Sequence, residues 1–298
     1  MSELFRALAC LAEPPAAQSA AIAAALDLPG IPTAAEYVDC FTFQRYPYAS
    51  VYLNTDGMLG GEARDRIGGF FRALALAPPA EPDHIAVVLS LYAQLIDTEN
   101  DVAEPARKRL VRVARKALLY EHLLSWLPPY VETFETASTF YRAWAGVLAQ
   151  AVANERDELG EPDALPIHYR DVPALADPRI EGTDAFLDSL LAPIRSGFIL
   201  LRDDLGRAAA ALNLGLRRAE RRFVLRSLFA QEPVAMLSWL TRNAAAAARR
   251  YGELSAWPGG YCAAWTQRCY ASVELLESLC AQATKAEAGF RDVVHERE

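Results

Sequence analysis

Three prolines keep the start of the stretch from Pro78 to Leu95 (PPAEPDHIAVVLSLYAQL) out of any helix, because each fixes φ and lacks an N–H. Asp83 follows at the position of a helix N-cap, where its carboxylate would accept backbone N–H groups. Apolar residues at helical spacing then predict a buried helix: Ile85, Val88, Leu89, Tyr92, Leu95 and Ile96. The stretch therefore predicts that Asp83 and His84 lie at the mouth of a buried helix. A capped core helix with an incidental histidine is the alternative that it leaves open.

A second stretch repeats the combination of an acid and a histidine beside apolar residues. It runs from Tyr120 to Tyr130 and reads YEHLLSWLPPY. Its Pro-Pro pair is a helix stop, since neither proline can continue the hydrogen-bond ladder. An aromatic-rich segment, EYVDCFTFQRYPYASVYL, precedes both stretches in the chain.

Taken together, these segments resemble the TorD/DmsD/NarJ-type maturation chaperones of molybdenum oxidoreductases. Members of that family carry a Pro-Asp-His step that opens a helix and, further on, a Glu-His-Leu-Leu-(Pro)-Trp step. Here the first step ends at His84, and the second, EHLLSW, begins at Glu121. Ser125 departs from the usual proline. The resemblance covers roughly the first half of the chain, and it rests on the ordered pair of steps rather than on either one.

The composition limits the function classes. The chain has 298 residues, of which 52% are hydrophobic, and a formal net charge of −8. An acidic chain is a poor nucleic-acid binder and a suitable partner for a basic peptide. Five cysteines, an odd number, give no disulfide framework and indicate a reducing compartment. With no apolar run near the ~20 residues of a membrane span and no basic region at the N-terminus, we expect a cytoplasmic protein.

The fold expected is all-α and TorD-like, a single helical domain over residues 1–298. Periodic apolar positions indicate about a dozen helices and no strand or hairpin pattern. Residues 160–182 hold four prolines and no helical period. We interpret this segment as a surface connection between the better-matched half, 1–159, and a second helical half, 183–288. A connection of this length would also permit a domain-swapped homodimer, so monomer and homodimer both remain open.

Catalytic and metal-binding patterns are weak. No nucleophile stands beside an ordered histidine and acid, and the four histidines form no zinc motif. Asp97 and Asp101, four residues apart after an apolar helix, leave open an all-α isoprenoid-synthase-like enzyme using Mg²⁺. Three arginines share one helix face, and we expect them to pair with acids, an anionic contact being the alternative: Arg218, Arg222 and Arg226.

The resemblance implies a chaperone rather than an enzyme. It would bind the apo catalytic subunit of a molybdopterin oxidoreductase, and its twin-arginine signal peptide where there is one, and assist cofactor insertion and assembly. No cofactor would be bound permanently, since the molybdopterin belongs to the client; neither nucleic acid nor membrane insertion is expected. A structural assembly subunit is the alternative of another class. The candidate binding residues are Asp83, His84, Glu81, Tyr48, Tyr52, Tyr92, Glu121, His122 and Trp126.

Overall fold

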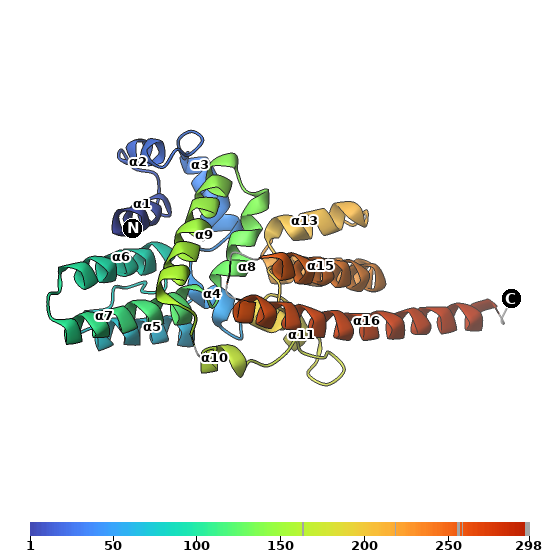
Figure 1. The fold of residues 1–298 in the computed structure, drawn as a ribbon. Helices are drawn as coiled ribbons and strands as arrows, with labels where there is room; N and C mark the ends of the chain where they lie inside the picture. Colours follow the sequence, from blue (N-terminus) through green and yellow to red (C-terminus); the bar gives the residue numbers. More distant parts are fainter. Residues whose placement is uncertain (163, 218, 255–256, 258, 296–298) are drawn as a thin grey trace. The chain divides into compact units, whose positions relative to one another are not determined.

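The computed structural model describes residues 1–162, 164–217, 219–254, 257 and 259–295, and these contain helices and no β-strand. This confirms the all-α prediction. The chain divides into two compact units (Figure 1): unit 1 comprises Met1–Asp171 and Leu254–Cys262, and unit 2 comprises Val172–Glu253 and Ala263–Glu298. The boundary at Asp171 falls within the proline-rich connection at 160–182. The single domain expected over 1–298 stays a prediction.

Unit 1 contains most of the elements. In chain order they are α1 (Ser2–Leu11), α2 (Ser19–Ala25), α3 (Ala34–Tyr37), η1 (Val38–Gln44), α4 (Ala49–Leu53), α5 (Gly61–Ala73), α6 (Ile85–Asp101), α7 (Pro105–Ala117), η2 (Leu118–Leu123), α8 (Leu127–Glu132), η3 (Thr133–Thr136), α9 (Thr139–Leu159) and α10 (Ile167–Arg170).

The core of unit 1 forms where α1 packs on α6 and α9 (Figure 1). Phe5 and Leu8 of α1 are fully buried, and the indole N–H of Trp144 donates to the carbonyl of Leu8 at 3.1 Å. Phe41 adds an edge-on contact to Trp144, with ring centroids 5.7 Å apart. Aromatic side chains from separate segments thus hold the elements together.

Two helices change their winding along their length. Thr33 and Glu36, a Thr-x-x-Glu pattern in the sequence, form a capping box, with the Glu36 N–H donating to the Thr33 hydroxyl at 3.1 Å. The helix that it opens becomes a π-helix, η1, from Val38. Helix α7 likewise passes into the π-helix η2 at Leu118. Wider turns of this kind re-aim side chains, and periodicity does not reveal them.

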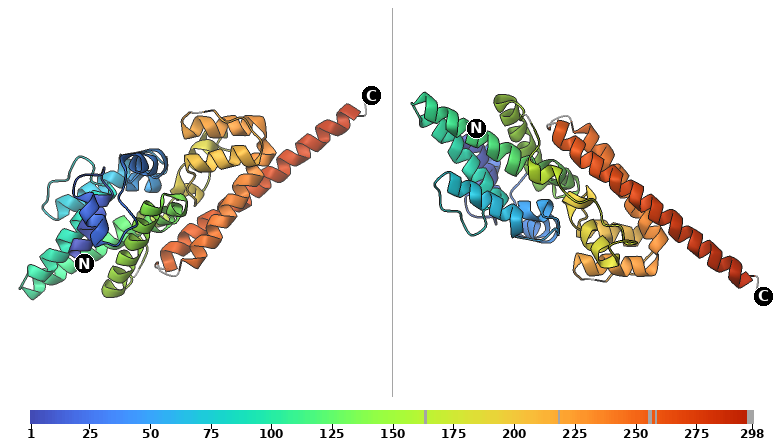
Figure 2. Two further views of the ribbon diagram at one scale, coloured as in Figure 1. Left: turned by 90° about the horizontal axis from the view of Figure 1, so that it is seen from above. Right: turned by 90° about the horizontal axis from the view of Figure 1, so that it is seen from below.

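Unit 2 contains α11 (Thr183–Leu190), α12 (Pro193–Ser196), α13 (Arg202–Ala211), α14 (Arg221–Gln231), α15 (Pro233–Glu253) and the part of α16 (Gly259–His295) from Ala263 onward. Figure 2 shows α16 as one continuous helix near α15, where the side chains of Ser238 and Cys280 lie 3.2 Å apart. Gly197 follows α12 with φ +84, and a Cβ there would lie 2.4 Å from the backbone nitrogen of Cys269. The close approach of α12 to α16 therefore requires glycine.

Acidic partners surround the arginine run on α14. Arg222 pairs with Asp188 and Asp184 of α11, and Arg226 also pairs with Asp184. The expected pairing with acids is confirmed for these two residues, whereas Arg218 lies outside the described residues.

Candidate functional site

The Pro-Asp-His step and the aromatic stretch at 46–52 fold against each other. The N–H of Ala49 donates to the carbonyl of Asp83 at 3.1 Å, and the N–H of Ile85 donates to the carbonyl of Pro47 at 2.7 Å. Tyr48 and His84 form an antiparallel bridge between them. Two segments more than thirty residues apart in sequence are therefore joined through their backbones.

Asp83 does not cap the helix that follows it. Its side chain is 2% exposed, and its carboxylate accepts the N–H of Ser50 at 3.1 Å. Ser50 lies in the first turn of α4, where N–H groups have no partner within the helix. The prediction that Asp83 caps α6 is therefore wrong. Asp83 caps α4 instead, because the backbone bridge between Tyr48 and His84 places the first turn of α4 next to the Asp83 carboxylate.

His84 is the N-cap of α6. Its Nδ1 accepts the N–H of Ala86 at 3.2 Å, so Nδ1 carries no proton in this arrangement. Burial lowers the pKa of His84 below 6.5, against the opposing influence of Glu13, Glu81 and Asp83. The imidazole is therefore neutral at neutral pH.

Two accessible carboxylates flank this imidazole. Glu13, just after α1, places Oε1 3.5 Å from Nδ1 of His84 and is half exposed. Glu81 is exposed and accepts the phenol hydrogen of Tyr48 at 2.9 Å. Burial and the Glu81 carboxylate raise the pKa of Tyr48, whose ring meets the His84 ring edge-on at 4.9 Å. We call Glu13, Tyr48, Glu81 and His84 the His84 cluster.

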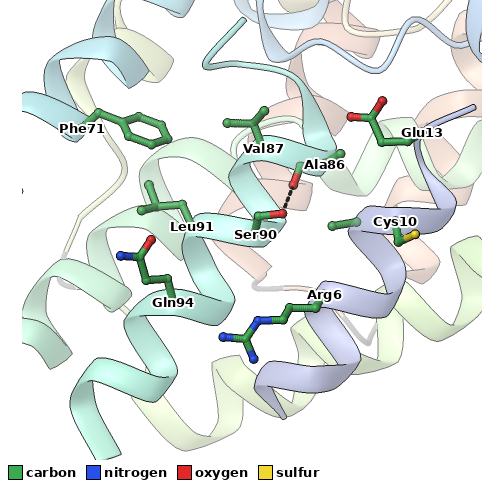
Figure 3. Close-up of a pocket in the computed structure, with 10 residues that line it drawn as sticks. Arg6, Cys10, Glu13, Phe71, Ala86, Val87, Ser90, Leu91 and Gln94 are labelled. Carbon is green, nitrogen blue, oxygen red and sulfur yellow. Dashed lines mark hydrogen bonds between the residues drawn. The ribbon is translucent and has the colours of Figure 1, made fainter. Parts of the chain in front are cut away.

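A cavity of about 510 Å³ opens between α1 and α6 (Figure 3). It is lined by Arg6, Ala9, Cys10, Glu13, Phe71, Ala86, Val87, Ser90, Leu91 and Gln94. In Figure 3, Cys10 and Glu13 face it from the α1 side, and Val87 and Leu91 face it from α6. Glu13 belongs to both the cavity wall and the His84 cluster, so the cavity and the cluster are continuous.

Three predicted groove residues pack in the core. The ring of Tyr52 stacks on Trp126 with centroids 5.2 Å apart, and both side chains are almost fully buried. Tyr92 is fully buried, and its hydroxyl donates to Glu155 at 2.6 Å. In this structure they are core residues and do not line an open groove. Their part in client binding stays a prediction.

Glu121 and His122 lie at a second location, on η2. Glu121 is exposed, whereas His122 is buried and its ring meets that of Phe70 edge-on at 5.2 Å. The carbonyl of His122 accepts the indole N–H of Trp126 at 2.8 Å. The EHLLSW step thus anchors an aromatic core and leaves one carboxylate in solvent.

Sequence reasoning missed Glu13. No local pattern marks Glu13 as a site residue, because its role depends on where α1 packs. Its position just before the Pro14-Pro15 pair was the one available signal, since the prolines end the helix and leave Glu13 at its tip.

The aspartates considered for Mg²⁺ have other surroundings. Asp97 pairs with Arg6, and both Asp97 and Asp101 belong to the last turns of α6, not to a turn after it. Across the described part of the chain, no three or more His, Cys, Asp or Glu side chains gather as a metal site.

Fold and site together define an all-α protein with a cavity that has the Glu13 carboxylate in its wall. A profile described as nitrate reductase delta subunit matches residues 9–132, which include both steps and every residue that lines the cavity except Arg6. The chaperone protein TorD of Psychrobacter sp. (strain PRwf-1) is 30% identical over 161 residues, covering 48% of this chain and 72% of that protein. The chain belongs to the TorD chaperone family.

Other relatives match a shorter region. The chaperone protein TorD of Vibrio vulnificus (strain YJ016) is 32% identical over 90 residues, 28% of this chain and 41% of that protein. The chaperone protein TorD of Photobacterium profundum is 26% identical over 98 residues, 32% of this chain and 45% of the relative. The chain thus spans less than half of these relatives' length. No solved structure matches it.

Proposed function

We propose that the protein is a maturation chaperone for the catalytic subunit of a molybdopterin oxidoreductase. It binds the apo subunit in the cytoplasm, before cofactor insertion and before export where the client is exported. The His84 cluster and the α1–α6 cavity form the binding surface. The observation that carries this proposal is the double role of Glu13, which joins an acidic rim to an apolar-walled cavity.

The chemistry of the surface suits a client segment with arginines beside apolar residues, as in a twin-arginine signal peptide. Glu13 and Glu81 offer carboxylates that guanidinium groups bind through charge-assisted hydrogen bonds. The walls contributed by Val87, Leu91 and Phe71 would receive the apolar part.

The charge of unit 1 favours the same client. Unit 1 contains 23 Asp and Glu against 14 Lys and Arg, whereas unit 2 contains 15 against 16. The acidity of the chain is therefore concentrated in the unit that carries the cavity. A basic segment would be attracted to that unit over a distance comparable to the Debye length.

The test is a titration of the N-terminal segment of an apo molybdopterin oxidoreductase subunit that carries paired arginines. Glu13→Gln combined with Glu81→Gln should weaken binding about tenfold, since each partly solvated pair contributes modestly. Glu135→Gln combined with Asp65→Asn removes two exposed acids elsewhere in unit 1 and should change little. Equal affinity for all three proteins would contradict the proposal.

The description of the family profile as a subunit makes a structural assembly subunit the second candidate. A chaperone and an assembly subunit differ in how long they stay bound to the catalytic subunit. A chaperone should co-purify with the apo subunit and be absent from the mature enzyme, whereas an assembly subunit would remain at fixed stoichiometry.

A further inference from the structure

Helix α7 presents a basic and apolar surface to solvent. It packs on α6 and η2. Leu110 and Val113 are 70% and 66% exposed. They are three residues apart and therefore adjacent on one face.

Cations surround this apolar pair. At 3.6 residues per turn, Arg109 lies beside Val113, and Arg107 lies on the far side of Leu110. Arg107, Lys108 and Arg109 are exposed, and within the described residues none of them pairs with a carboxylate. Arg112 and Arg115, on the inner side of the helix, are by contrast engaged by Glu99 and Glu158. Lys108, seven residues before Arg115, lies on that inner side as well, and Lys116 donates to the carbonyl of Glu161 at 2.8 Å. Arg107 and Arg109 are therefore the cations that flank the apolar pair.

We propose that this α7 face, formed by Ala106, Arg107, Arg109, Leu110 and Val113, docks reversibly on the anionic surface of a lipid bilayer. A helix with apolar side chains between cations lies in the interface, its apolar residues among the acyl chains and its cations near the phosphates. The proposal does not depend on the identity of the client or on the His84 cluster.

Charge complementarity selects this partner. Unit 1 as a whole is acidic, so an anionic surface repels much of that unit and is attracted to the cations of the α7 face. The face lies on the outside of a single helix and is therefore convex. A convex face fits the flat surface of a bilayer better than it fits a peptide, which binds in a groove. In the described part of the chain no helix is long and apolar enough to cross a bilayer.

The test uses the full chain and two kinds of vesicle, phosphatidylcholine alone and phosphatidylcholine mixed with phosphatidylglycerol. We expect sedimentation with the mixed vesicles only, and its loss at high salt. Replacing the flanking cations together by Arg107→Gln and Arg109→Gln should weaken binding about 25-fold, at about fivefold per charge. Leu110→Ser with Val113→Ser should weaken it while leaving the thermal melt unchanged.

Matched controls come from unit 2. Ile180→Ser removes a side chain that is 83% exposed, and Arg242→Gln with Arg249→Gln removes exposed cations. These variants should bind the mixed vesicles like the wild type. Equal sedimentation with both kinds of vesicle would overturn the proposal. Control variants that bind the mixed vesicles as weakly as the α7 variants would overturn it too. A third result would also overturn the proposal: the wild-type protein binds neither kind of vesicle, and the α7 variants lose affinity for the client subunit. The α7 face would then be a protein-binding surface.

Discussion

The carboxylate of Asp83 accepts the backbone N–H of Ser50 at 3.1 Å, so the aspartate of the Pro-Asp-His step caps a helix that lies earlier in the chain. This bond joins the loop before α6 to the start of α4. It also fixes the backbone on which Tyr48 and His84 meet. The buried aspartate thus positions the His84 cluster.

Substitutions at Asp83 should separate a positioning role from direct contact with the client. Asp83→Ala leaves a buried N–H unpaired, so we expect the free energy of unfolding to fall by about 1–3 kcal/mol and client affinity to fall with it. Asp83→Asn keeps an acceptor oxygen and should be mild in both measurements. Urea unfolding and peptide titration check this. If Asp83→Asn kept its stability and lost tenfold or more in affinity, the aspartate would instead bind a client arginine directly.

His84 should make the protein less stable in mild acid. Burial lowers its pKa below 6.5, so the unfolded chain takes up the proton first. The stability from the neutral imidazole is complete above pH 6.5 and is lost as the pH falls toward the folded pKa. His84→Asn retains an N-cap acceptor for Ala86 and should flatten this part of the profile. Urea unfolding of both proteins across this range is the measurement, and identical slopes would contradict the prediction.

Arg115 should be among the most sensitive positions of unit 1. Its side chain is 4% exposed, and its guanidinium lies 2.8 Å from oxygens of Glu99, Glu155 and Glu158. Arg115→Met leaves buried carboxylates without a counter-charge, which should cost about 3–5 kcal/mol of unfolding free energy. Arg112→Met removes a more exposed partner of the same acids and should cost less. Thermal melts in which Arg112→Met is the less stable variant would contradict the prediction that Arg115 is the central cation among these acids.

Gly197 offers a test of the packing in unit 2. Gly197→Ala would force a Cβ against the backbone of Cys269 at a positive φ, so we expect a loss of about 2 kcal/mol or more. Gly146→Ala is the matched control, because that glycine lies inside α9 with open space around its Cβ position. The control should stabilise by roughly 0.5–1 kcal/mol. Chemical unfolding of both variants measures whether the free energy of unfolding falls for Gly197→Ala and rises for Gly146→Ala.

Local sequence patterns predicted much of this fold and only part of its site. The helical periodicity, the Thr33–Glu36 capping pattern and the prolines before α6 are local signals. The structure contains the corresponding helices, the capping box and the non-helical approach to α6. The cap partner of Asp83 and the burial of Tyr92 depend on contacts between distant segments, which no local pattern encodes. Glu13 was missed for the same reason, since the cavity exists only once α1 lies on α6.

The central claim is that the client segment occupies the α1–α6 cavity, and Cys10 reports on it directly. Its side chain faces the cavity and is partly exposed, as is that of Cys280 in unit 2, whereas Cys40, Cys262 and Cys269 are buried. Maleimide labelling should therefore modify Cys10 and Cys280 first. An excess of the arginine-bearing client segment should slow labelling of Cys10 several-fold and leave Cys280 unchanged. Unchanged labelling of Cys10 at saturating segment would contradict the claim.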